Sequence, residues 1–130
     1  MSTWIPFTAG PEVRADGPVV VSLTDFTFRR RHLPAVARLG LRLRQGWYAM
    51  PGAVGLWLWA EPLRGRSGSV SVWTNEDDLR RFVRLPAHTA IMRDWRSRGS
   101  LRATTLHADR FDRAAILADA RRWLADAQAV

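Results

Sequence analysis

The 130-residue sequence contains no cysteine, which excludes disulfide scaffolds, thiolate zinc sites and cysteine nucleophiles. It also contains no lysine. All twenty basic residues are arginine, and twelve acidic residues leave a formal net charge of +8. Such a charge can attract nucleic acid or anionic lipid. Because the arginines are spread along the chain and form no basic arm, we expect a solvated basic surface and no nucleic-acid partner.

Long hydrophobic runs are also absent. The longest nearly uncharged stretch, residues 45–60, is interrupted by glycine and proline and is too short to span a membrane. Residues 1–10 lack a basic run followed by an apolar block, so no signal peptide is expected. With 47% hydrophobic residues, the chain is expected to form one domain over residues 1–130, cytoplasmic and without a membrane partner. Residues 1–17 hold two prolines and two glycines and are expected to be an irregular lead-in.

The hydrophobic periodicity predicts a β-α-β-β-α-β order followed by a C-terminal helix. A Pro-Gly pair at 51–52 predicts a turn, and the arginine- and glycine-rich segment 62–68 predicts a loop. Asn75 is expected to cap a helix, with Asp78 in the capping-box position. The expected strands span residues 18–28, 54–61, 69–73 and 101–107, and helices are expected to begin near residues 33, 76, 87 and 113.

This order predicts an α+β, ferredoxin-like domain: a four-stranded antiparallel sheet with helices on one face, plus the extra C-terminal helix. The other face is expected to present Trp57, Trp59 and Trp73. Three exposed indoles are too much aromatic surface to leave in water. We therefore expect a second copy of the sheet to cover them in a homodimer.

Two segments resemble known proteins. The stretch SVSVWTNEDDLRRFVRLPAHTAIMRDWRSRGS resembles the dimeric α/β-barrel superfamily that includes the antibiotic-biosynthesis monooxygenases. Its shared features are a strand ending in Trp73, a capped acidic helix start, Phe82, and His88 followed by Met92. The upstream stretch VVVSLTDFTFRRRHLPAVARLGLRLRQGWYAMPGAVGLWLWAEP is similar to spheroidene-monooxygenase-like proteins. Together the similarity covers about residues 18–107 and implies a dimeric α/β barrel.

The resemblance implies a monooxygenase-like oxidoreductase of secondary metabolism that acts on a hydrophobic aromatic or polyene substrate. Cofactor-independent oxygenases of this superfamily rely on an electron-rich substrate that passes an electron to oxygen itself. The superfamily also includes cyclases, isomerases, haem enzymes and proteins of no known chemistry. A haem-binding oxygenase and a non-catalytic ligand-binding dimer therefore remain alternatives.

His88 is the candidate catalytic residue. Helical spacing places His88, Ile91, Met92 and Trp95 on one face, so the imidazole is expected among apolar groups. Burial would keep the ring neutral at pH 7. A neutral imidazole can act as a general base, a hydrogen-bond donor or a haem ligand. The alternative is a core histidine bonded to a backbone carbonyl.

The remaining candidates are expected to bind substrate. Asp25 has the opposite strand parity to Phe26 and is expected to be either a polar group in the barrel or the partner of an arginine. The other two histidines, His32 and His107, are expected at the surface. No nucleotide-binding motif and no histidine–carboxylate spacing is present, so neither a nucleotide cofactor nor a metal is expected. The full set of predicted substrate-binding residues is Trp57, Trp59, Trp73, Met92, Phe26 and Asp25, around His88.

Overall fold

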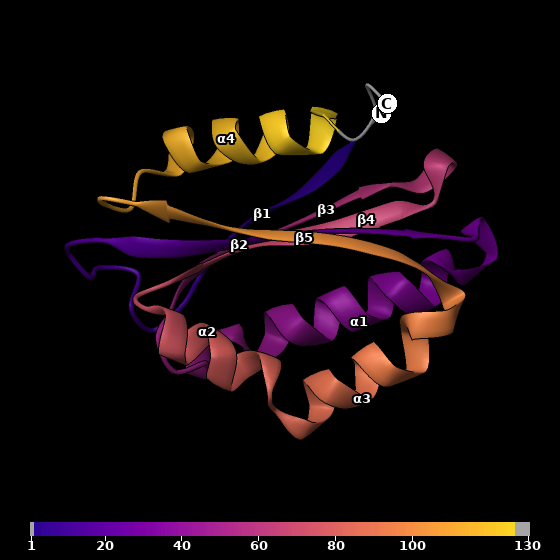
Figure 1. Cartoon of the computed structure of the whole chain (residues 1–130), viewed down its shortest axis with the longest axis horizontal. Helices are drawn as coiled ribbons and strands as arrows, with labels where there is room; N and C mark the ends of the chain where they lie inside the picture. Colours follow the sequence, from indigo (N-terminus) through magenta and orange to yellow (C-terminus); the bar gives the residue numbers. More distant parts are fainter. Residues whose placement is uncertain (1, 127–130) are drawn as a thin grey trace.

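A five-stranded antiparallel sheet forms the centre of the protein (Figure 1). The computed structural model describes residues 2–126. The sheet order is β1-β3-β4-β2-β5. The strands are β1 (Thr3–Ala9), β2 (Val19–Phe28), β3 (Ala53–Glu61), β4 (Arg66–Trp73) and β5 (Gly99–Ala108), and the helices are α1 (Leu33–Gly46), α2 (Glu76–Val83), α3 (Pro86–Trp95) and α4 (Arg113–Asp126).

The predicted β-α-β-β-α-β order is confirmed for the strands β2 to β5 and the helices between them. The prediction that residues 1–17 are irregular was wrong, because β1 lies within them and makes the sheet five-stranded. β1 is an edge strand paired with β3 alone, and its register shifts between Ile5 and Thr8. An irregular edge strand tolerates Pro6, which has no N–H to donate to a neighbouring strand.

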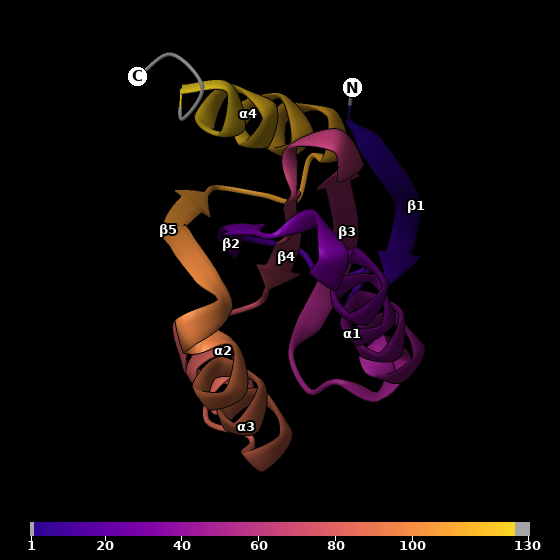
Figure 2. The ribbon, with the colours of Figure 1, turned by 90° about the vertical axis from the view of Figure 1, so that its right-hand side faces the viewer.

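The helices cover both faces of the sheet, whereas the sequence predicted helices on one face. Helices α1, α2 and α3 lie on one side and α4 lies on the other (Figure 1), and the turned view in Figure 2 shows the same arrangement. Trp57 packs in one cluster with Ile116 and Ala120 of α4, and its ring lies 4.8 Å from that of Phe7 in β1. Trp59 is also buried, with its ring 6.3 Å from that of Trp4. The apolar face that was expected to need a second copy is covered by this chain's own α4 and β1.

The three tryptophans do not share one face. Trp57 pairs with Val70 across the β3–β4 ladder, and Val70 and Trp73 are three residues apart. An odd step along a strand reverses the face to which a side chain points. Trp73 therefore packs with Trp47 and Leu56 on the α1 side, separate from Trp57 and Trp59. The prediction that placed all three together was wrong, because it did not carry the strand register through to Trp73.

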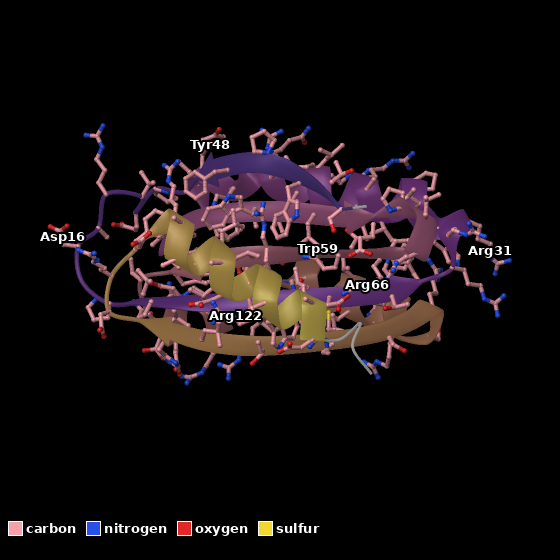
Figure 3. The ribbon with its side chains drawn as sticks, turned by 90° about the horizontal axis from the view of Figure 1, so that it is seen from above. Asp16, Arg31, Tyr48, Trp59, Arg66 and Arg122 are labelled. Atoms are coloured by element: carbon pink, nitrogen blue, oxygen red, sulfur yellow. The ribbon has the colours of Figure 1, made fainter. Side chains whose placement is uncertain are left out.

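A buried guanidinium group, that of Arg66, lies under the C-terminal turn of α4 (Figure 3). Its Nη2 and Nε donate to the carboxylate of Asp25 at 2.7 and 3.2 Å, and its Nη1 donates to Glu61 at 3.1 Å. The hydrogen bond to Asp25 is the largest cause of a raised pKa for Arg66, and burial partly opposes it. Of the two interpretations of Asp25, the arginine partner is confirmed.

The same cluster binds the end of α4. Nη2 of Arg66 donates to the carbonyl of Leu124 at 3.5 Å, and Nη2 of Arg102 donates to the carbonyl of Trp123 at 3.0 Å. Arg102 also stacks over the Trp123 ring at 3.6 Å and approaches Asp25 at 3.3 Å. Because the last carbonyls of a helix lack partners within it, these arginines fix α4 against the sheet.

We expect Arg66→Leu to lower the free energy of unfolding by about 3–5 kcal/mol, because it leaves the carboxylates of Asp25 and Glu61 buried without their main cation. Urea denaturation followed by tryptophan fluorescence measures this loss. The matched control is Arg64→Leu, which removes an exposed guanidinium 3.6 Å from the same Glu61 and should cost less than about 1 kcal/mol. Equal losses in the two variants would contradict the assignment.

Candidate functional site

The helix side of the sheet carries an aromatic cluster around Trp73. This residue ends β4 and is fully buried, and its Nε1 donates to Oγ of Ser71 at 3.0 Å. The Trp73 ring lies 5.2 Å from the rings of both Trp47 and Phe82. The cluster therefore joins the sheet to the turn after α1 and to α2.

The position of Phe82 follows from how α2 begins. Oδ1 of Asn75 accepts a hydrogen bond from the backbone N–H of Asp78 at 2.8 Å, which confirms the predicted cap. Three acidic residues, 76–78, occupy the first turn, where the helix dipole favours negative charge. The helix thus starts three residues after Trp73, and about two turns later its apolar side returns Phe82 to the Trp73 ring.

His88 lies near the start of α3, after Pro86 at the first helical position. Its ring is half-buried and meets that of Phe82 edge-on, with 4.9 Å between the centroids. Nδ1 is buried and has no hydrogen-bond partner among the described residues. Desolvation lowers the pKa of His88, and hydrogen bonding with the backbone of Val83, the feature expected of a core histidine, only partly offsets this. The ring is therefore neutral at pH 7, and within residues 2–126 no group, the Val83 backbone included, meets the geometry of a hydrogen bond to Nδ1.

A groove of about 320 Å³ lies between α2 and β5. His107 stands on its β5 side and Glu76 on its α2 side, with 2.6 Å between Nε2 and Oε1. Val83 also lines the groove, and its backbone neighbours the His88 ring, so the groove is adjacent to the imidazole. The residues that line it are Glu76, Leu79, Arg80, Val83, Arg84, Thr105 and His107.

Sequence reasoning missed a row of hydroxyl groups on this side of the sheet. Register places Ser71, Ser22 and Thr105 side by side across β4, β2 and β5, one step from Trp73. In the next rung, Oγ1 of Thr24 and Oγ of Ser69 lie 2.8 Å apart. The signal was present in β4, where serines alternate with valines up to Trp73. The face near His88 is therefore aromatic at one end and hydroxyl-bearing at its centre.

The structure brings together only part of the predicted site. Trp73 and His88 meet through Phe82, and Phe26 lies on the same side, with its ring edge-on to that of Trp95 at 6.2 Å. Met92 lies on α3 and is 42% exposed. The other three predicted residues, Trp57, Trp59 and Asp25, lie on the α4 side of the sheet. One chain therefore cannot gather all seven around a single pocket, because a sheet separates them.

Three observations concern metal, haem and membrane binding. Among residues 2–126, no three histidine, aspartate or glutamate side chains are grouped to hold a metal ion. The α2–β5 groove does not include His88 among its lining residues. None of the described helices is long and apolar enough to cross a membrane.

Comparisons with known proteins find structural relatives only. No family model and no curated protein matches the sequence. SnoaB, a cofactor-independent oxygenase from Streptomyces nogalater, is 21% identical with a TM-score of 0.54, over 69% of this chain and 92% of that one. A proposed antibiotic biosynthesis monooxygenase from Deinococcus radiodurans is 18% identical with a TM-score of 0.63, over 72% and 95%. LmHde, a haem-degrading enzyme from Listeria monocytogenes, is 17% identical with a TM-score of 0.58, over 78% and 68%.

At these identities the likeness establishes the fold. The chain has the ferredoxin-like fold of the antibiotic-biosynthesis-monooxygenase type of dimeric α/β-barrel proteins. The resemblance of residues 69–100 implied this fold. The similarity of residues 19–62 to spheroidene-monooxygenase-like proteins is not supported by these comparisons and stays a prediction.

The lowered pKa of His88 predicts how stability depends on pH. As the pH falls through the ordinary histidine value of 6.5, the unfolded chain takes up a proton that the folded chain resists, so the free energy of unfolding falls. In His88→Gln this component disappears. The stability advantage of the wild type over the variant should therefore shrink between about pH 7.5 and pH 5. Urea denaturation across this range measures it, and an advantage that grows on acidification would contradict the assignment.

Proposed function

We propose that this protein is a monooxygenase-type enzyme for a hydrophobic aromatic or polyene small molecule bound on the helix side of the sheet. His88 acts as the general base or as a hydrogen-bonding group toward the substrate. The observation that carries the proposal is the buried Nδ1 of His88, which has no partner among the described residues. A buried polar atom without a partner costs free energy, and a substrate group that bonds it would remove that cost.

The chemistry asked of His88 is proton transfer. A neutral imidazole accepts a proton from an acidic O–H or C–H of the substrate and becomes an imidazolium. The substrate anion that remains is more electron-rich and passes an electron to molecular oxygen more readily. The lowered pKa of His88 keeps the ring in its accepting form at pH 7, so the proposed step needs only substrate, oxygen and this side chain.

The surroundings of His88 suit an aromatic ligand. Phe82 and Trp73 supply flat apolar surface beside the imidazole, and Leu79 and Val83 supply apolar lining in the adjacent groove. The hydroxyls of Ser22 and Thr105 lie on the same face of the sheet and can donate to substrate oxygens. Apolar walls with a few polar groups are typical of small-molecule sites.

The haem alternative is tested separately. LmHde is described as haem-degrading, and a neutral imidazole is a haem ligand in other proteins. His88 is not among the residues that line the α2–β5 groove, and we derive no step through haem. Titration with haemin measures this directly: no Soret shift is expected, and a shift that His88→Ala abolishes would favour the alternative.

A homodimer belongs to the proposal, because the fold is that of dimeric α/β-barrel proteins. In this chain Trp57 already packs against α4, and Trp59 is buried beside Trp4 and Arg66. A second copy would therefore pack against α4 or along an edge strand and leave these indoles where they are. Sedimentation equilibrium measures the assembly, and the substrate site proposed here does not depend on it.

We expect His88→Ala to lower the rate of oxygen consumption by a factor of about 10²–10⁴, the range that a general base contributes. An oxygen electrode measures the rate with a set of electron-rich hydroxyarenes and hydroquinones. His32→Ala is the control, because it removes a histidine that contacts Trp95 at the far end of α3 and should leave the rate unchanged. Both variants must keep the wild-type circular dichroism spectrum.

Two outcomes would contradict the proposal. Equal rates in His88→Ala and the wild type would show that this ring takes no part in the reaction. Binding of the same compounds, seen as quenched tryptophan fluorescence with no oxygen consumed by any of them, would instead favour a non-catalytic ligand-binding protein.

A further inference from the structure

Arginines from three separate segments gather at one end of the molecule. β2 ends at Phe28, which pairs with Gly99 at the start of β5, and the N–H of Phe28 donates to the carbonyl of Gly65 at 2.8 Å. The 3₁₀ turns that lead out of β2, join β3 to β4 and enter β5 therefore lie together. We call this surface the arginine end, and it consists of Arg29, Arg30, Arg31, Arg64, Arg96 and Arg98.

The guanidinium groups of the arginine end have almost no acidic partners. All six residues are exposed. Arg64 lies 3.6 Å from the buried carboxylate of Glu61, and within residues 2–126 no carboxylate is within ion-pair distance of the other five. Arg98 covers the ring of Trp95 at 4.9 Å. The surface thus presents a concentrated, uncompensated positive charge.

Acidic residues gather at the opposite end of the strands. They lie in the loops before β2 and after β5 and in the first turn of α2. Figure 3 shows Asp16 and Arg31 at the two extremes of the long axis. The acidic residues of this opposite end are Glu12, Asp16, Glu76, Asp77, Asp78, Asp109 and Asp112. Acidic side chains are therefore concentrated at the end opposite the arginine end, where arginines such as Arg80 and Arg81 pair with them.

The arginine end is not explained by folding stability. Arg29, Arg30 and Arg31 directly precede α1, which has no acidic residue in its first turn and no side-chain cap. Positive charge at a helix N-terminus opposes the helix dipole, and neighbouring like charges repel one another. A local arrangement that costs stability without compensation is typical of a functional surface.

An exposed apolar side chain stands among these charges. Leu63, in the turn between β3 and β4, is 79% exposed, and this turn contacts the turn that holds Arg30 and Arg31. Arginine around an apolar contact is typical of protein–protein interfaces. The nearest large ring, Trp95, has Arg98 over it and is in edge-on contact with Phe26 and His32, so less of the ring is open for a nucleic-acid base to stack on.

We propose that the arginine end is a docking surface for an acidic protein, whose carboxylates pair with the arginines and whose surface has an apolar pocket for Leu63. This surface is separate from the His88 site, and its test does not depend on activity. The probe is a fluorescently labelled amphipathic helical peptide with one glutamate-rich and one leucine-rich face, about five turns long. Polyglutamate and single-stranded oligothymidylate of similar length are the comparison probes, and fluorescence anisotropy measures binding from about 20 to 300 mM NaCl.

We expect the amphipathic peptide to bind and its affinity to fall with salt. The double substitution Arg30→Glu with Arg31→Glu should weaken binding at least about tenfold. The matched control, Arg14→Glu with Arg110→Glu, makes the same change in net charge at exposed positions of the opposite end and should leave binding within about twofold. Leu63→Ser should weaken the amphipathic peptide about tenfold and polyglutamate hardly at all, because only the former supplies apolar surface.

Three results would overturn the proposal. No binding of the peptide at the lowest salt would show that the arginine end attracts no acidic partner. Equal weakening by the two charge-reversal pairs would assign any binding to net charge alone. Tighter binding of oligothymidylate than of the peptide, unaffected by Leu63→Ser, would assign the surface to nucleic acid. Thermal unfolding of each variant confirms that it is folded, and glutamate before α1 should, if anything, raise the melting temperature.

Discussion

Burial of both faces of one sheet is the constraint on which the rest of this structure depends. Side chains along a strand point alternately to the α4 side and to the side of the other three helices. The position of a residue in its strand therefore decides whether it packs under α4 or lies on the side of the candidate site. In β3 the alternation gives Trp57 and Trp59 to the α4 side and Leu56 and Leu58 to the α1 side. The candidate site is left with the residues of opposite parity, which in β4 are the serines that lead to Trp73. A single step of register would exchange the two sets.

The buried ion cluster makes the two sides of the sheet differ in how firmly their helices are held. Because Arg66 bonds Asp25, Glu61 and the end of α4, the α4 side is closed by charges that are costly to separate. On the other side, α3 holds no buried residue, and the ring of Trp95 meets that of Phe26 in the sheet. A ligand therefore enters more easily on the side that holds His88 than on the side that holds the indoles of Trp57 and Trp59.

The sequence predicted the local signals well. The Asn75 cap, the strand over residues 18–28 and the helix beginning near residue 87 each depend on signals within a few residues, and all three were confirmed. β1 was missed because Pro6 argues against a strand unless the strand is known to lie at an edge. That knowledge comes from the assembled sheet and is not contained in residues 1–17.

Features that depend on distant contacts could not be predicted from local patterns. Nothing in residues 113–126 states which face of the sheet α4 covers, so the indoles of β3 seemed to need a second copy. An arginine was correctly predicted as one possible partner of Asp25. Which arginine it is could not be predicted, because Arg66 is 41 residues away in sequence. The arginines at 29–31, 64 and 96–98 likewise look dispersed until three turns meet. The pairing of His88 with Phe82 was within reach, since both lie on consecutive helices that a proline separates.

Trp95 lies between the His88 site and the arginine end. Its ring is edge-on to that of Phe26, on the side of the sheet that α1, α2 and α3 cover. Arg98 of the arginine end lies over the same ring. His88 and Trp95 are seven residues apart on α3, two turns along the same side of the helix. Arg98 therefore lies over the ring through which α3 contacts Phe26 of β2. The helix that carries His88 thus begins beside Phe82 of α2 and ends at the arginine end, so its two ends serve two different surfaces.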